Sequence, residues 1–130
     1  MKLLTLVTAV ITLTASALTF ATQVSQMSQA QLLSMINAPK SEAYVILDVR
    51  SAEEFSEGHL PGAINVSHDQ IEQHLTDLSQ HKDTLVVVHC RSGRRAQVAE
   101  TALINNGFSK LQHLAGDYKG WVAADLPIVK

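Results

Sequence analysis

The only cysteine of the 130-residue chain, Cys90, stands between an apolar run and a cluster of arginines. The sequence around it is VVVHCRSGRRAQVAE, in which Arg91, Arg94 and Arg95 follow the cysteine closely. A cysteine thiolate is a nucleophile, and nearby cations or a helix N-terminus stabilise the ionised form. These residue types in this order indicate nucleophilic chemistry on an anionic substrate. The structural alternative is a buried apolar thiol beside a solvated helix start.

The residues on either side of the cysteine predict how it is positioned. Residues 84–89 are apolar enough for a strand, and residues 96–105 have a helical pattern. Residues 90–95 would then form a strand-to-helix loop, which is where open α/β sheets bind ligands. Gly93 permits a turn in which backbone N–H groups of the loop and of the helix N-terminus converge on the sulfur.

The spacing within this loop separates two kinds of cysteine chemistry. A cysteine phosphatase needs the pattern Cys-x5-Arg, so that the loop wraps a phosphate and the final arginine binds it with two hydrogen bonds. Ala96 occupies that position here, and Arg95 comes one residue earlier. A shorter loop suits a single sulfur atom rather than a tetrahedral phosphate, so the spacing favours sulfur transfer.

The rest of the chain predicts the elements that carry this loop. Apolar runs of strand length alternate with helical patterns. The predicted strands are residues 44–49, 63–66, 84–89 and 111–114, and the predicted helices are residues 28–37, 51–55, 68–78, 96–105 and 116–123. Capping boxes at Ser28 and Ser51 mark helix starts, and the fourth helix should bury Val98, Ala102 and Leu103. The alternation predicts an α/β domain with a small, mostly parallel sheet flanked by helices on both faces.

The first 21 residues have the pattern of a secretory signal peptide. A short basic start is followed by the uncharged residues 3–18 and by small residues that allow cleavage after Ala17 or Ala21. A retained membrane anchor is the alternative, although the apolar run is marginal for the roughly 20 residues that span a bilayer. We expect residues 1–21 to be a cleaved signal, giving a periplasmic or secreted protein with no stable membrane insertion.

Composition and spacing argue against several other functions. The formal net charge of −2 gives no broad attraction to nucleic acid, and a single cysteine cannot form an internal disulfide. Six histidines are present, but the chain has no Cys-x2-Cys or His-x3-His spacing of the kind found in metal sites. We therefore expect no nucleic-acid partner, no metal and no cofactor. We interpret His89, next to the thiol, as a structural residue at the end of a strand.

Two long segments resemble the rhodanese (thiosulfate sulfurtransferase) family. VILDVRSAEEFSEGHLPGAINVS is similar to the N-terminal signature of that family, and VVVHCRSGRRAQVAETALINNGFSKLQHLAGDYKGW is similar to its active-site loop, helix and C-terminal signature. The plan of a signal followed by one such domain is similar to exported single-domain rhodaneses of bacteria. The resemblance covers about residues 27–129 and implies a single rhodanese-like domain over residues 22–130.

The resemblance also implies a reaction and a set of site residues. Cys90 would take a sulfane sulfur from thiosulfate or a similar anionic donor and pass it, as a persulfide, to a thiophilic acceptor such as cyanide. Asp48 and Arg50 match an acidic and basic pair that supports the loop from beneath, whereas an exposed Arg50 without a partner is the alternative. The positions that match the substrate-binding loop are Arg91, Ser92, Gly93, Arg94 and Arg95, with the three arginines as the anion-contacting side chains.

The chain departs from the family near the expected rim of the pocket. The family commonly has two glycines where this chain has Ala115-Gly116, and a glycine before the final Leu-Pro where it has Asp125. These departures bear on substrate preference rather than on the chemistry at Cys90. A second hypothesis is a persulfide carrier or redox relay with a protein acceptor, because the domain is small and has no resolving cysteine. A cysteine phosphatase or arsenate reductase is a third hypothesis, which Ala96 opposes.

Overall fold

The computed structural model describes residues 9–16, 24–38 and 42–130. Strands and helices alternate along these residues. The strands are β1 (Ser25–Met27), β2 (Tyr44–Asp48), β3 (Ile64–Asn65), β4 (Leu85–His89) and β5 (Leu111–Leu114). The helices are α1 (Gln29–Asn37), α2 (Ala52–Glu57), α3 (Leu75–Leu78), α4 (Arg94–Asn105) and α5 (Asp117–Ala123), with the short 3-10 helices η1 (Glu72–His74) and η2 (Ser79–His81) on either side of α3. Within the described residues, no helix is long and apolar enough to cross a membrane.

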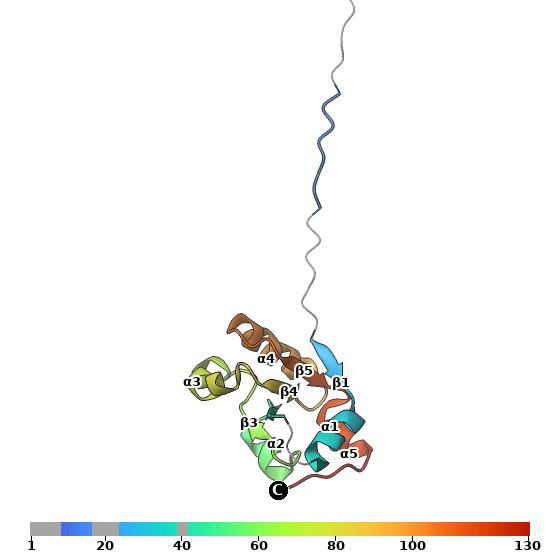
Figure 1. Cartoon of the computed structure of the whole chain (residues 1–130), viewed down its shortest axis with the longest axis vertical. Coiled ribbons are helices and arrows are strands. Elements are labelled where there is room, and N and C mark those ends of the chain that lie inside the picture. The colour runs from blue at the N-terminus through green and yellow to red at the C-terminus, as the bar shows by residue number, and fades with distance from the viewer. Residues whose placement is uncertain (1–8, 17–23, 39–41) are drawn as a thin grey trace, which may run out of the picture.

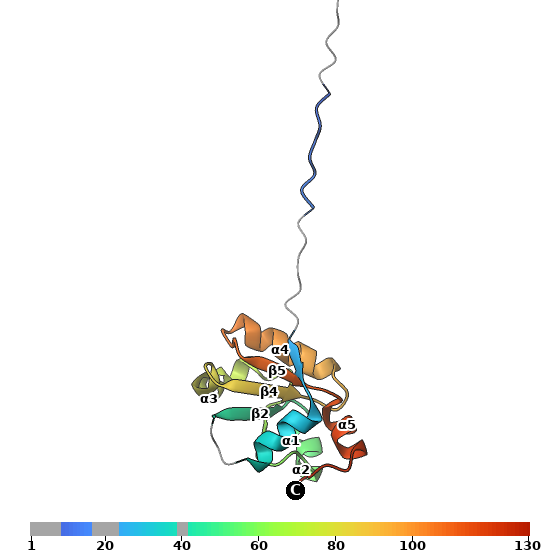
Figure 2. The same cartoon turned by 45° about the vertical axis from the view of Figure 1, so that its right-hand side comes forward.

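The strands form one parallel sheet in the order β1-β5-β4-β2-β3. Asp48 of β2 lies beside His89 of β4, so the two strands end level with each other. Because all strands run in the same direction, the connections that follow β2, β4 and β5 leave from one edge of the sheet. Figures 1 and 2 show α3 and α4 on one face of this sheet and α1 and α5 on the other.

Two apolar clusters hold the helices on the sheet, one on each face. On the α3 and α4 side, the buried cluster includes Leu47 and Val88 from the sheet and Leu103 from α4. On the opposite side, Leu32 of α1 and Trp121 of α5 are fully buried in the second cluster. Since both faces of the central strands are covered, these strands have near-continuous apolar sequences. The predicted α/β fold, with helices on both faces of a parallel sheet, is confirmed.

Both predicted capping boxes are present and fix the starts of two helices. The Ser28 hydroxyl accepts the N–H of Gln31, whose side chain accepts the N–H of Ser28. Ser51 and Glu54 make the same reciprocal pair at the start of α2. The second box also orients Glu54, which contacts α4 as described below.

The structure differs from the sequence prediction in three elements. Ser25–Met27 forms the edge strand β1, paired with β5, although three residues carry too short a pattern to predict a strand. The helix predicted over residues 68–78 is broken into η1 and α3. Val98, predicted to face inward, is 52% exposed. The buried residues of α4 are Ala96, Ala99, Glu100 and Leu103.

Candidate active site

Cys90 follows β4 directly and has an exposed fraction of only 1%. The backbone N–H of Gly93 donates a hydrogen bond to Cys90 Sγ across 3.0 Å. Gly93 has a φ of 116°, in the region that side-chain-bearing residues rarely adopt, and it is the N-cap of α4. This turn brings the start of α4 to the sulfur, an arrangement that stabilises a thiolate or a negatively charged group carried on it.

The loop between β4 and α4 is shorter than the sequence predicts. Helix α4 begins at Arg94 and not at Ala96, so the connection is residues 90–93. The positive φ of Gly93 turns the chain into the helix at once, and this places Arg94 and Arg95 in its first turn. Ala96 is fully buried in the core. The position that holds the phosphate-binding arginine in a Cys-x5-Arg loop is therefore occupied here by Ala96, on the buried face of α4.

The three arginines after Cys90 have different surroundings. Arg91 and Arg94 are exposed and form no ion pair within the part of the chain that the structure describes. Arg95 instead forms a bidentate pair with Glu54 of α2, with Nη1–Oε1 and Nη2–Oε2 distances of 2.7 and 3.0 Å. The hydrogen bond from Arg95 lowers the pKa of Glu54 to about 2. Arg95 thus joins α4 to α2, and its predicted contact with the substrate stays a prediction.

Asp48 and Arg50, predicted to support the loop, form a buried ion pair at the end of β2. Their side chains are 0% and 3% exposed, and Arg50 Nη2 lies 2.7 Å from Asp48 Oδ2. The same Nη2 donates to the carbonyl oxygen of Gly58 across 2.7 Å. The Arg50 guanidinium also lies 3.8 Å from the centre of the Tyr118 ring on α5. The pair therefore connects β2 to α5, and the alternative of an exposed Arg50 without a partner is wrong.

His89 is fully buried immediately before Cys90. Its Nδ1 lies 2.9 Å from the carbonyl oxygen of Cys90, which can only accept, so Nδ1 carries a hydrogen. Its Nε2 has no hydrogen-bond partner among the described residues and lies 3.7 Å from Asp48 Oδ2. Burial lowers the pKa of His89 and favours the neutral ring. His89 thus bonds to the backbone of Cys90, as a structural residue would.

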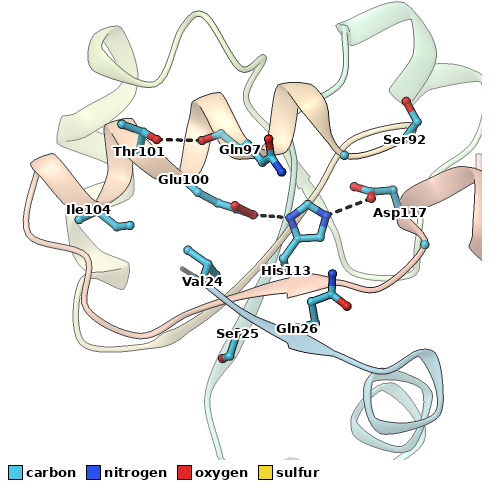
Figure 3. Close-up of a pocket in the computed structure, with 12 residues that line it drawn as sticks. Val24, Ser25, Gln26, Ser92, Gln97, Glu100, Thr101, Ile104, His113 and Asp117 are labelled. Atoms are coloured by element: carbon cyan, nitrogen blue, oxygen red, sulfur yellow. Dashed lines mark hydrogen bonds and ion pairs between the residues drawn. The ribbon is translucent and has the colours of Figure 1, made fainter. Parts of the chain in front are cut away.

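Three ionisable residues outside the sequence prediction lie close to the cysteine loop. They are Glu100 of α4, His113 of β5 and Asp117 at the start of α5, and Figure 3 shows the His113 ring between the two carboxylates. Asp117 Oδ1 accepts the backbone N–H of Cys90 across 2.9 Å. One signal for this cluster is present in the sequence, because Glu100 falls on the same helix face as Ala96 and Leu103.

Left-handed backbone occurs at or next to both departures from the family pattern. Gly116 has a φ of 83°, and Asp117 and Asp125 have φ values of 53° and 56°. Glycine adopts such values most readily. The two adjacent positions with glycine-like backbone are therefore Gly116 and Asp117, directly after Ala115. Aspartate thus occupies two of these left-handed positions, 117 and 125.

Two cavities adjoin the loop. The larger, about 930 Å³, has Ser92, Gly93 and His113 among its lining residues. The smaller, about 390 Å³, includes Arg91 and Lys119 in its wall. Across residues 9–16, 24–38 and 42–130, no group of three His, Cys, Asp or Glu side chains is placed to hold a metal ion. The larger cavity thus meets the cysteine loop at Ser92 and Gly93, and the smaller cavity meets it at Arg91.

Comparisons with known proteins found similarity over most of the chain. Residues 28–124 match the family described as Rhodanese-like domain. The uncharacterized protein YibN of Escherichia coli K12 is 31% identical over 126 residues, covering 96% of this chain and 85% of YibN. Thiosulfate sulfurtransferase 16, chloroplastic, of Arabidopsis thaliana is 37% identical over 93 residues, covering 62% of this chain and 76% of the relative.

A solved structure shows the same fold. The crystal structure of a rhodanese-related protein from Thermoplasma volcanium has a TM-score of 0.68 and 25% sequence identity, and the match covers 81% of this chain and 97% of that chain. The family match extends over most of the chain and includes the cysteine loop and the elements that position it. The chain belongs to the rhodanese-like domain family.

Proposed function

We propose that this protein is a sulfurtransferase that moves a sulfane sulfur from thiosulfate, or a similar donor, to a thiophilic acceptor through a persulfide on Cys90. The observation that carries the proposal is the hydrogen bond from the Gly93 N–H to Cys90 Sγ at the start of α4. The exposed Arg91 and Arg94 add positive charge to the same loop and to the first turn of α4. The name of the Arabidopsis relative, a thiosulfate sulfurtransferase, supports the same reaction.

In the first step, the Cys90 thiolate attacks the outer sulfur of thiosulfate. A bond forms between Sγ and that sulfur, the S–S bond of thiosulfate breaks, and sulfite leaves with the bonding electron pair. The N–H of Gly93 and the free N–H groups at the start of α4 stabilise the negative terminal sulfur of the persulfide. Arg91 and Arg94 attract the anionic donor.

In the second step, the acceptor attacks the terminal sulfur of the persulfide. Cyanide leaves with this sulfur as thiocyanate, and the electron pair of the broken S–S bond returns to Cys90 as the thiolate. Atoms and charges balance over the two displacements without a cofactor. Sulfite must leave before the acceptor reacts, so the two half-reactions are separate.

Steady-state kinetics test this sequence of steps. Initial rates measured against thiosulfate at several fixed cyanide concentrations should give parallel double-reciprocal lines. Cys90→Ser should have no measurable turnover, because its hydroxyl is a far weaker nucleophile than a thiolate. Intersecting lines, or turnover that persists in Cys90→Ser, would contradict the proposal.

The burial of Cys90 favours a second candidate, a persulfide carrier that delivers sulfur to a partner protein. An exposed fraction of 1% would shield a persulfide from small nucleophiles in solution. Arg91 and Lys119 line the smaller cavity together with the exposed Val122, and they offer a contact surface for a partner. A carrier should be isolated with a stable persulfide and should react with cyanide much more slowly than with thiosulfate. Rapid turnover with cyanide would exclude it.

We also propose that the protein is exported to the periplasm or secreted, with residues 1–21 removed as a signal peptide. The basic, apolar and small-residue segments of the sequence support this, while residues 17–23, which contain both cleavage sites, lie outside the described residues. The mass of the protein recovered from a periplasmic fraction should correspond to cleavage after Ala17 or Ala21. Full-length protein in the membrane fraction would instead support a retained anchor.

A further inference from the structure

Glu100, His113 and Asp117 form a continuous chain of hydrogen bonds from three different elements. His113 Nδ1 lies 2.5 Å from Glu100 Oε1, and His113 Nε2 lies 3.0 Å from Asp117 Oδ2. The three residues are buried, with exposed fractions between 4% and 9%. In Figure 3, the carboxylates approach the His113 ring from opposite sides. No step of the proposed sulfur transfer uses these three side chains.

The hydrogen-bond pattern fits a His113 ring with both nitrogens protonated. An ionised carboxylate can only accept, so between two carboxylates each ring nitrogen of His113 carries a hydrogen. His113 is then an imidazolium between two carboxylates. The hydrogen bonds with Asp117 and Glu100 raise the pKa of His113 to about 10, in agreement with this geometry. The cluster is therefore ionic at neutral pH, and His113 holds the Asp117 carboxylate in one orientation.

The cluster meets the cysteine loop at two points. Asp117 Oδ1 accepts the Cys90 N–H across 2.9 Å, and the N–H of Tyr118 donates to the Cys90 carbonyl across 3.0 Å. Both backbone groups of Cys90 are thus held by consecutive residues of α5. Asp117 also packs against Gly93, where an added Cβ would lie 3.2 Å from Asp117 Oδ2. The carboxylate bonds to Cys90 and lies beside Gly93, the residue whose N–H bonds to Sγ.

Asp117 keeps this position in an unfavourable backbone conformation. Its φ of 53° is left-handed, where an L-residue is strained and glycine is not. A strained residue beside a reactive group suggests a role for its side chain. Asp125 provides the comparison, because it has nearly the same φ, 56°, but is exposed.

We propose that Asp117, held by His113 and Glu100, is a positioning residue that keeps the Cys90 backbone and Gly93 in place, so that the Gly93 N–H points at the sulfur. This inference rests on the proposed sulfur transfer at Cys90. The carboxylate does not touch the reacting atoms and acts through the loop. Loss of the carboxylate should therefore weaken the hydrogen bond from Gly93 to Sγ and slow both displacement steps.

Asp117→Gly tests this role, since glycine tolerates the backbone conformation and removes only the side chain. Asp125→Gly is the matched control, and Asp117→Asn keeps an oxygen that can accept the Cys90 N–H. We expect Asp117→Gly to lower kcat for transfer from thiosulfate to cyanide about tenfold, the effect of losing a hydrogen bond to a charged group. The KM for thiosulfate should change little, Asp117→Asn should recover most of the rate, and Asp125→Gly should match the parent protein.

The pH dependence of Cys90 alkylation by iodoacetamide gives a readout that does not require sulfur transfer. Loss of the Gly93 hydrogen bond should move the midpoint of the rate profile toward higher pH, since that bond favours the charged sulfur. Removing a nearby carboxylate without moving the loop would shift the midpoint downward. An upward shift in Asp117→Gly but not in Asp125→Gly supports the positioning role. An unchanged or lower midpoint overturns it.

The two measurements also separate this inference from the proposed function. If the parent protein fails to take sulfur from thiosulfate, the proposed function fails, while the alkylation profiles still decide the role of Asp117. If Asp117→Gly does not fold, His113→Gln replaces it, because losing the imidazolium should release the carboxylate and raise the midpoint in the same direction. A His113→Gln profile identical to that of the parent protein overturns the inference.

Discussion

Two arginine–carboxylate pairs flank the cysteine loop, and they differ mainly in burial. The Arg50–Asp48 side chains are 3% and 0% exposed, whereas the Arg95 and Glu54 side chains are each 31% exposed. The shortest N–O distance is 2.7 Å in both pairs. Removing one partner of a buried pair leaves an uncompensated charge where water cannot reach it, whereas a partly exposed charge is rehydrated. The buried Arg50–Asp48 pair should therefore contribute strongly to stability, whereas the partly exposed Arg95–Glu54 pair should contribute little.

The largest effect is expected from breaking the buried pair. Arg50→Met should lower the free energy of unfolding by about 3–5 kcal/mol, because Asp48 is left as a buried charge. The substitution also removes the hydrogen bond to Gly58 and the contact with Tyr118. Urea denaturation of the two proteins measures the difference. A loss below about 1 kcal/mol, the range of exposed pairs, would show that burial does not decide the contribution of this pair.

The matched substitution for Arg50→Met is made in the partly exposed Arg95–Glu54 pair. Arg95→Met should lower the free energy of unfolding by no more than about 1 kcal/mol, because water screens and rehydrates Glu54. Denaturation under the same conditions as for Arg50→Met makes the comparison direct. Equal losses in the two variants would contradict the distinction between the two sites.

A smaller effect is expected from acid, which should remove the Arg95–Glu54 pair without a substitution. The pKa of Glu54 is lowered from 4.5 to about 2 by its hydrogen bond with Arg95. A lowered pKa in the folded state means that the pair stabilises the protein fully above the unfolded value and loses this effect as pH falls through the folded value. The stability difference between the parent protein and Arg95→Met should thus be constant above about pH 4.5, shrink as the pH falls, and disappear only below about pH 2. If the stability difference between the two proteins does not change with pH in this range, Arg95 stabilises the fold by packing and not by its charge.

Much of the fold follows from local sequence patterns. The central strands β2 and β4 are apolar at consecutive positions, and Ser28 and Ser51 have the spacing that starts a helix. The sole cysteine, Gly93 and the arginines identify the reactive loop, because these residues are adjacent in the chain. Each of these signals lies within a few residues.

The features of the candidate site that the sequence did not predict depend on contacts between segments far apart in the chain. Arg95 meets Glu54 across 41 positions, so the sequence around Cys90 cannot show that this guanidinium already has a partner. His113 and Asp117 come to Glu100 from other elements, and only the fold brings them together. The early start of α4 depends on the unusual φ of Gly93, which the residue type permits but does not require.

The central claim is that Cys90 carries the transferred sulfur, and intact-protein mass spectrometry tests it most directly. After incubation with thiosulfate, the protein should gain the mass of one sulfur atom, about 32 Da, as a persulfide. Cyanide should remove this gain, and Cys90→Ala should never acquire it. No gain in the parent protein, or an equal gain in Cys90→Ala, would contradict the account.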